Sequence, residues 1–187
     1  MTQIRTGNEH GDSEPTWTCL TRRRLLQGGI AATTVLLAIP GLKQKAVAAQ
    51  LASYPRQKIG QLSQLRVDQP LIFSYPDAAP SALSMAIKLG ERAGGGIGPQ
   101  QDVVAFNSLC THMGGPMIGS YQKQDKALGP CPFHQTTFDL TRHGMVISGH
   151  ATESLPQVLL ELEGDDIYAV GVLGLIFGRH DNLVGQA

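Results

Sequence analysis

Two short segments of this 187-residue chain each place a cysteine close to a histidine. The first has the pattern Cys110-x-His112 and the second the pattern Cys131-x-x-His134, with eighteen residues between His112 and Cys131. Thiolate sulfur and imidazole nitrogen are the protein ligands that suit zinc, copper and iron-sulfur centres. The four side chains therefore predict a metal or cluster site to which each segment contributes one cysteine and one histidine.

The order of the ligands indicates which centre this is. Structural zinc sites with two cysteines and two histidines usually group the cysteines in one pair and the histidines in another. Here each segment supplies one of each, which favours a Rieske 2Fe-2S cluster, with the thiolates on one iron and the imidazoles on the other. We expect Cys110, His112, Cys131 and His134 to be the metal ligands; a zinc site is the less favoured alternative.

The rest of the chain is typical of an all-β protein, because only 5% of its residues are aromatic and its 22 glycines and 11 prolines indicate many turns. Residues 83–89 alternate apolar and small or polar side chains, as a half-buried strand does. Residues 102–106 form the strand expected to lead into the first ligand pair. A hairpin is expected from 158–163 and 167–172, and a closing strand from 173–177.

Further short strands are expected beside the second ligand pair, at 126–128, 136–140 and 145–148, and a strand with edge character at 71–75. The fold prediction is a Rieske-type antiparallel β-sandwich or barrel base. A small cluster-binding subdomain, about 106–152, is inserted between its strands. Residues 94–99 are glycine-rich but lack the lysine of a phosphate-binding loop, so a turn or a subunit-contact segment is expected there.

The N-terminal part has the features of an export leader. Arg22-Arg23-Arg24 precedes apolar residues at the spacing of a twin-arginine (Tat) signal, and 28–42 is moderately apolar. Ala46-Val47-Ala48 offers a cleavage site between small residues. The apolar run is too short to span a bilayer comfortably, which favours a cleaved signal over a retained anchor. We expect a Tat signal peptide at 1–48, a Rieske domain at 49–187 and a periplasmic protein, with membrane association through a retained leader as the alternative.

Cysteine content and charge agree with this division. Cys19 lies in the predicted leader, so the mature chain keeps only Cys110 and Cys131 and has no pair left for a disulfide. The net charge of the whole sequence is zero, and residues 50–187 hold nine basic and twelve acidic side chains. This balance gives no sign of a nucleic-acid footprint.

The ligand segments resemble those of Rieske proteins in general. The longer runs 131–145 and 149–156 closely resemble the small subunit of arsenite oxidase. This resemblance covers the leader and most of the mature chain. It implies a large molybdopterin subunit with a 3Fe-4S cluster as partner. Electrons from arsenite would then pass through this Rieske cluster to cytochrome c or azurin, and the present chain would perform no substrate chemistry itself.

The resemblance also implies how the cluster potential is tuned. Many high-potential Rieske proteins have a disulfide between the ligand loops, and the corresponding positions here are Gly115 and Phe133. The hydroxyl that donates to a bridging sulfur is kept as Thr136, whereas a tyrosine that donates to a cysteine sulfur is replaced by Phe138. Hydrogen bonds to sulfur favour the reduced cluster, so we expect a potential below that of tyrosine-containing relatives, within about −150 to +300 mV.

Three other functions remain open at this point. A Rieske subunit of a quinol-oxidising respiratory complex would need a retained anchor and usually has the disulfide. A soluble Rieske ferredoxin for a ring dioxygenase would lack a leader. A zinc-binding module would have no redox activity. At least one of His112 and His134 is expected at the surface, where an imidazole edge gives an electron a short route to a partner, and His150 is a candidate neighbour of the cluster.

Overall fold

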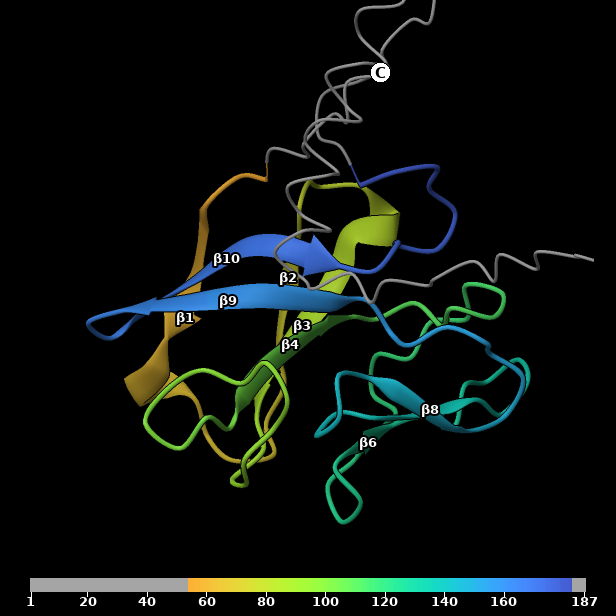
Figure 1. Ribbon diagram of the computed structural model, residues 1–187, viewed down its shortest axis with the longest axis horizontal. Helices are drawn as coiled ribbons and strands as arrows, with labels where there is room; N and C mark the ends of the chain where they lie inside the picture. Colours follow the sequence, from red (N-terminus) through yellow and green to blue (C-terminus); the bar gives the residue numbers. More distant parts are fainter. Residues whose placement is uncertain (1–53, 183–187) are drawn as a thin grey trace, which may run out of the picture. The chain divides into compact units, whose positions relative to one another are not determined.

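The computed structural model describes residues 54–182, which form ten β-strands and two short 3-10 helices. The strands make two antiparallel sheets, and no α-helix occurs among the described residues (Figure 1). The all-β prediction is therefore confirmed. No helix within residues 54–182 is long and apolar enough to cross a bilayer. The leader predicted at 1–48 lies outside the described residues.

The larger sheet, here called the base sheet, has six strands in the order β1-β10-β9-β4-β3-β2. Its strands are β1 (Gln57–Gln61), β2 (Leu71–Ser74), β3 (Leu83–Lys88), β4 (Val103–Asn107), β9 (Gln157–Glu163) and β10 (Asp166–Leu173). The β9–β10 hairpin closes in two residues, and Gly164 takes the positive φ of 60° that the first residue of such a turn often requires.

The smaller sheet, here called the cluster sheet, comes between β4 and β9 in the chain. Its order is β5-β6-β7-β8, with β5 (Tyr121–Gln122), β6 (Ala127–Leu128), β7 (Thr137–Asp139) and β8 (Met145–Ser148). The two predicted ligand segments flank β5 and β6. The region expected to form a cluster-binding subdomain, about 106–152, thus contains this sheet.

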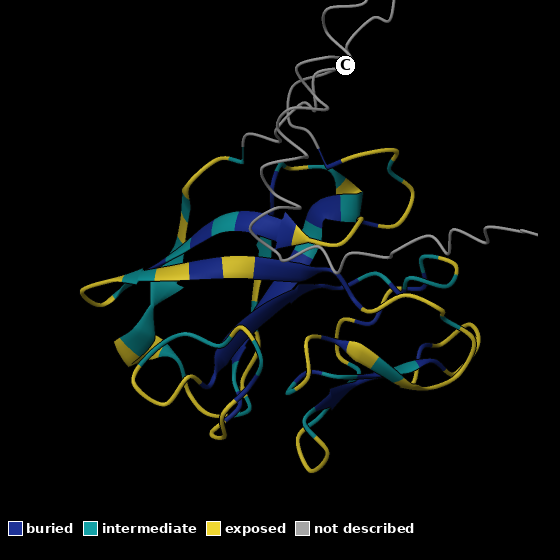
Figure 2. Cartoon of the chain, in the orientation of Figure 1, coloured by how far each residue is buried: buried dark blue, intermediate teal, exposed yellow. Residues whose placement is uncertain are grey.

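Strands β3 and β4 of the base sheet are buried on both faces (Figure 2). On one face, Met85 and Phe106 belong to a core that continues into the cluster sheet. On the other face, Ala86 and Ala105 belong to the core of the base itself. Residues 83–89 were expected to be half-buried. That prediction is wrong because Ser84, between its apolar neighbours, is also fully buried.

Two further differences concern the edges of the sheets. The closing strand expected at 173–177 is absent: β10 ends at Leu173 and the following residues form turns and irregular chain. The edge beside β10 is instead occupied by β1, which the polar sequence around 57–61 did not reveal. Strand β5 was also missed, because two residues are too few to show a pattern.

Polar contacts fix the cluster sheet to the base. Asp68, in the base, accepts hydrogen bonds from the Tyr121 hydroxyl (2.6 Å) and from the Lys126 ammonium (2.7 Å). On another side, the backbone N–H of Gly94 donates to the carbonyl of Thr141 at 2.7 Å. The glycine-rich segment 94–99 contains turns on either side of a bridge between Ile97 and Val103, and Gly94 contacts the cluster-bearing half of the same chain.

Candidate metal centre

The first ligand segment follows β4 and is folded by its own backbone. The N–H of Cys110 donates to the carbonyl of Gly115 at 2.9 Å, and the N–H of Gly114 donates back to the carbonyl of Cys110 at 2.8 Å. Gly114 has φ +68°, a left-handed conformation that glycine adopts without steric cost. The side chain of Asn107 supports this loop from below by accepting the N–H of Leu109 at 3.0 Å.

The second ligand segment has the same hydrogen-bond frame. The N–H of Cys131 donates to the carbonyl of Thr136 at 2.8 Å, and the N–H of Gln135 donates to the carbonyl of Cys131 at 2.9 Å. Gln135 takes the left-handed position with φ +63°. The cysteine opens each frame, whereas the histidine is the third residue of the first frame and the fourth of the second.

The folding of these frames brings the four predicted ligands together. Both cysteines are buried and free, in one apolar core with each other. The rings of His112 and His134 meet edge to face with their centroids 4.6 Å apart. His134 is exposed and His112 is partly exposed. The expectation that at least one of these imidazoles reaches the surface is confirmed.

This donor set fits a two-iron cluster in its chemistry. Two thiols lie on the inner side and two imidazoles on the outer side, as one sulfur-bound and one nitrogen-bound iron require. Among residues 54–182, no three His, Cys, Asp or Glu side chains are grouped so that they could hold one metal ion. In a two-iron cluster each iron needs only two protein ligands, because the sulfides complete its coordination.

The electrostatics of Cys110 depend on its burial. Burial raises the pKa of this thiol above its usual value, and hydrogen bonding by the backbone N–H of His112 opposes the rise. The neighbouring Cys131 thiol raises the pKa further, whereas the Thr136 hydroxyl lowers it. Metal ligation requires the thiolate, so a bound cation is needed to keep this buried sulfur deprotonated.

Thr136 connects the second ligand segment to the loop after β8, residues 149–156, here called the third loop. It is fully buried, and its Oγ1 accepts the backbone N–H groups of His150 (3.1 Å) and Ala151 (3.3 Å). A hydroxyl has two acceptor lone pairs and one hydrogen to donate. Because the acceptor positions are occupied, the hydrogen is available to a sulfur atom. The tuning role of Thr136 stays a prediction, and this geometry leaves the hydroxyl hydrogen free for it.

The positions of the absent disulfide are filled by a glycine and an aromatic ring. A Cβ atom on Gly115 would lie 2.6 Å from the Cys131 Sγ and 3.1 Å from the ring of Phe133. Only glycine lets the first loop approach the second this closely. Phe133 is largely exposed, so it covers Gly115 from outside. Phe138 is fully buried in the core that contains both cysteines, and it offers no hydroxyl to sulfur.

His150 lies beside the paired imidazoles. Its ring centroid is 5.7 Å from that of His112 and 6.3 Å from that of His134. Gly149 brings it there: its φ is +96°, and a Cβ atom would lie 2.3 Å from the Cα of Thr136. The sequence suggested His150 only as a neighbour by its position in the third loop, and the structure confirms that proximity.

Comparison with known proteins agrees with this site. Residues 82–159 match the Rieske 2Fe-2S domain family. The chain is 58% identical over 168 residues to the iodate reductase subunit IdrB of Denitromonas iodatirespirans, and this alignment covers 90% of this chain and 89% of that protein. It is 57% identical over 162 residues to IdrB of Pseudomonas sp. (strain SCT), covering 86% and 83%.

Structural similarity leads to the same superfamily. The soluble domain of Rieske protein II (soxF) from Sulfolobus acidocaldarius superposes with a TM-score of 0.59 and 25% identity, over 71% of this chain and 85% of that one. The fold and the matched domain identify a Rieske electron-transfer protein whose cofactor is a 2Fe-2S cluster. At these identities and coverages, the chain belongs to the Rieske 2Fe-2S proteins, within the family that contains the IdrB subunits.

Proposed function

We propose that Cys110, His112, Cys131 and His134 hold the cluster, and that the chain is the electron-transfer subunit of a molybdopterin oxidoreductase. The observation that carries this proposal is the arrangement of the four side chains. The two thiols are buried in one core, while the two imidazoles meet at the surface. A partner that contacts the imidazole edges comes within a short distance of the cluster, and the buried side protects the cluster from solvent.

Iodate reduction is the first candidate for the activity of the whole enzyme. It is supported by two relatives named as iodate reductase subunits, which match this chain over more than four-fifths of both lengths. In such an enzyme, electrons would enter through the Rieske cluster and pass to the molybdenum subunit. This chain would accept and donate single electrons, and the partner would carry out the oxygen-atom chemistry.

Arsenite oxidation is the second candidate, favoured by the resemblance of residues 131–145 and 149–156 to the arsenite oxidase small subunit. Electrons would then run in the opposite direction, from the molybdenum subunit through this cluster to cytochrome c or azurin. The role of the Rieske chain is the same in both enzymes. The direction of flow depends on the substrate and on the relative potentials of the partners.

Purification from the native organism tests the proposal. A molybdenum-containing subunit should copurify with this chain, and the complex should reduce iodate with a reduced dye as donor. Arsenite oxidation with an oxidised dye, without iodate reduction, would select the second candidate. Absence of any molybdenum subunit from the intact protein would overturn both and would favour a quinol-oxidising complex or a free ferredoxin.

Export belongs to the same proposal. The Arg22-Arg23-Arg24 segment supports Tat-dependent transport of the folded, cluster-loaded protein, with its large partner, to the periplasm. Sequencing of the mature N-terminus tests cleavage after Ala48. Replacement of Arg22 and Arg23 by lysine should retain the protein in the cytoplasm, and normal export of that variant would contradict this part of the proposal.

A further inference from the structure

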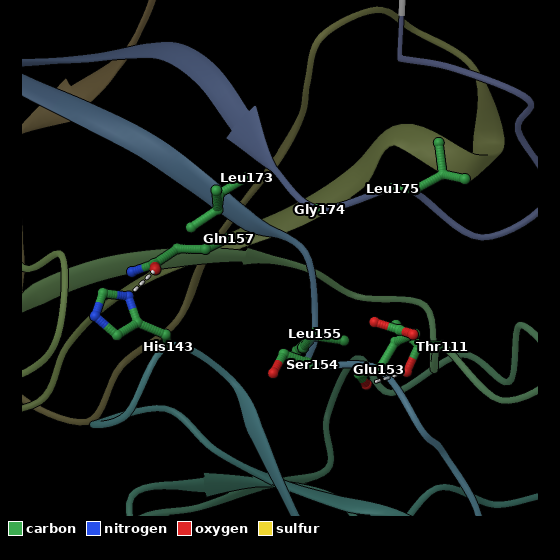
Figure 3. A pocket seen from close by; sticks show the side chains of 9 residues that line it. All are labelled: Thr111, His143, Glu153, Ser154, Leu155, Gln157, Leu173, Gly174 and Leu175. Atoms are coloured by element: carbon green, nitrogen blue, oxygen red, sulfur yellow. Dashed lines mark hydrogen bonds between the residues drawn. The ribbon is translucent and has the colours of Figure 1, made fainter. Parts of the chain in front are cut away.

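An apolar groove of about 490 Å³ lies next to the first ligand segment (Figure 3). One wall comes from Leu173 and Leu175, at and just after the end of β10. Thr111, Glu153 and Leu155 form another part of the lining, on the cluster-bearing half of the chain. The groove therefore joins the end of the base sheet to the loops around the metal centre.

The wall after β10 is unusually apolar for a surface segment. Leu173 is 56% exposed and Leu175 is 51% exposed; Phe177, which follows them but does not line the groove, is 37% exposed. These residues have the composition of an inner strand, yet within residues 54–182 no strand pairs with 174–177. Contiguous patches of exposed large apolar side chains on a protein often mark interaction sites.

A hydrogen bond and a close packing contact link the residues at the groove to the ligand loops. The Thr111 hydroxyl donates to the backbone carbonyl of Glu153 at 2.8 Å, which fixes the residue next to Cys110 to the third loop. The ring of Phe177 lies against Gly114, where a Cβ atom would be only 2.5 Å from it. A molecule seated in the groove would thus contact Thr111, the neighbour of His112 in the chain.

The charges around the groove limit the kind of occupant. Glu153 is exposed and forms no ion pair with any residue in the described part of the chain. At the other end, the ring of His143 is held by Gln157 through a 2.8 Å hydrogen bond, and Gln157 in turn donates to the carbonyl of Gly94 at 2.8 Å. The lining between them is chiefly apolar, so a complementary surface needs an apolar side chain next to one basic group.

We propose that this groove is the docking site for the molybdenum-containing subunit. That subunit inserts an apolar side chain between Leu173 and Leu175 and places a lysine or arginine against Glu153. The inference rests on the proposed function. Lasting subunit interfaces have apolar, well-packed centres, as this groove would provide. The exposed edge of His134 is then left for a soluble electron carrier.

Matched substitutions test the proposal. Leu175→Glu and Ile147→Glu each put a carboxylate on an exposed apolar position, 51% and 55% exposed, but Ile147 lies on β8, outside the groove. Leu175→Glu should weaken binding of the molybdenum subunit about 10-fold or more, whereas Ile147→Glu should leave it unchanged. Binding is measured by co-purification and by titration of the separated subunits.

The second test reverses the charge of Glu153. Glu153→Arg should weaken the same complex and Glu153→Gln should weaken it less, with the reduced-cluster EPR spectrum unchanged in both. Leu175→Ser serves in place of Leu175→Glu if the latter loses its cluster. Unaltered affinity in both the Leu175 and Glu153 variants would overturn the docking site while the proposed function stands. The docking site would also be overturned, with the proposed function intact, if these variants broke up only an assembly of copies of this chain and left the complex with the molybdenum subunit unchanged. If the wild-type chain copurifies no molybdenum subunit, the proposed function and the docking site both fall.

Discussion

The two ligand segments share one backbone frame but are held in different ways. In each, the cysteine N–H donates to the carbonyl five residues later, and a left-handed residue four positions after the cysteine donates back. The first loop uses Gly114 at that position and is packed against Phe177 and the base. The second loop uses Gln135 and is held by Thr136, which reaches into the third loop.

The better-supported loop has the less exposed histidine. The first loop is continuous with buried strand β4, and its histidine is only partly exposed. The second loop is supported mainly within the cluster-bearing half, and its histidine is exposed. The same frame thus sets both cysteines at equivalent buried positions, while the offset of the histidine and the support under each loop decide how far each imidazole projects.

Removal of either imidazole should have the largest effect. His112→Ala or His134→Ala takes away one of the two protein ligands of an iron, so we expect loss of the 2Fe-2S cluster from the purified protein. Iron and acid-labile sulfide analysis measures this. His180→Ala changes an exposed histidine outside the site and serves as the control. A stable Rieske spectrum in either ligand variant would contradict the assignment.

Hydrogen bonds to sulfur should give the next largest effect. Thr136→Val removes the hydroxyl, and a charge-assisted hydrogen bond of about 1.5–3 kcal/mol corresponds to a midpoint potential roughly 60–130 mV lower. Phe138→Tyr adds a hydroxyl in the core of the two cysteines and should raise the potential. Protein-film voltammetry measures both shifts. An unchanged potential in both variants would exclude this explanation of tuning.

The left-handed positions provide a direct comparison between the loops. Gly114→Ala places a methyl group 2.5 Å from Phe177 at φ +68°, so we expect a loss of about 2 kcal/mol or more in the free energy of unfolding. Gln135→Gly relieves the same strain in the second loop and should raise stability by less than about 1 kcal/mol. Urea unfolding followed by circular dichroism distinguishes them. Equal effects of the same sign would refute the proposed difference in support.

The contact between the cluster sheet and the base should depend weakly on pH. Hydrogen bonds from Lys126 and Tyr121 lower the pKa of Asp68 below its ordinary value. A depressed pKa stabilises the fold above the ordinary carboxyl pKa of about 4, and this stability is lost as the pH falls through the lower value. Asp68→Asn should lower the free energy of unfolding by about 1 kcal/mol at pH 7. It should also make that free energy fall less steeply with decreasing pH below about 4, the acid limb of the stability profile. An acid limb identical to that of the wild type would remove Asp68 from the explanation.

Much of the site could be predicted from the sequence because ligand type and spacing are local properties. Cys110, His112, Cys131 and His134 are brought together as expected, and the strands leading into and out of the loops follow apolar patterns. The shared hydrogen-bond frame was not foreseen, since backbone contacts leave little mark on residue types.

Long-range contacts explain the remaining differences. Residues 57–61 are polar and form a strand only because β10 offers an open edge. Residues 173–177 are apolar enough for a strand, but the chain turns away after Leu173 and leaves Leu173, Leu175 and Phe177 exposed, while Ile176 is buried. No strand of the described residues 54–182 covers Leu175 or Phe177, and the exposed Leu173 and Leu175 are the basis of the docking proposal.

The most direct test of the central claim is pulsed EPR of the reduced protein labelled with nitrogen-15 in histidine. Couplings from two imidazole nitrogens should appear, and substitution of His112 or His134 should abolish the cluster signal. A spectrum without nitrogen coupling, or one that survives both substitutions, would contradict a cluster held by buried thiolates on one iron and surface imidazoles on the other.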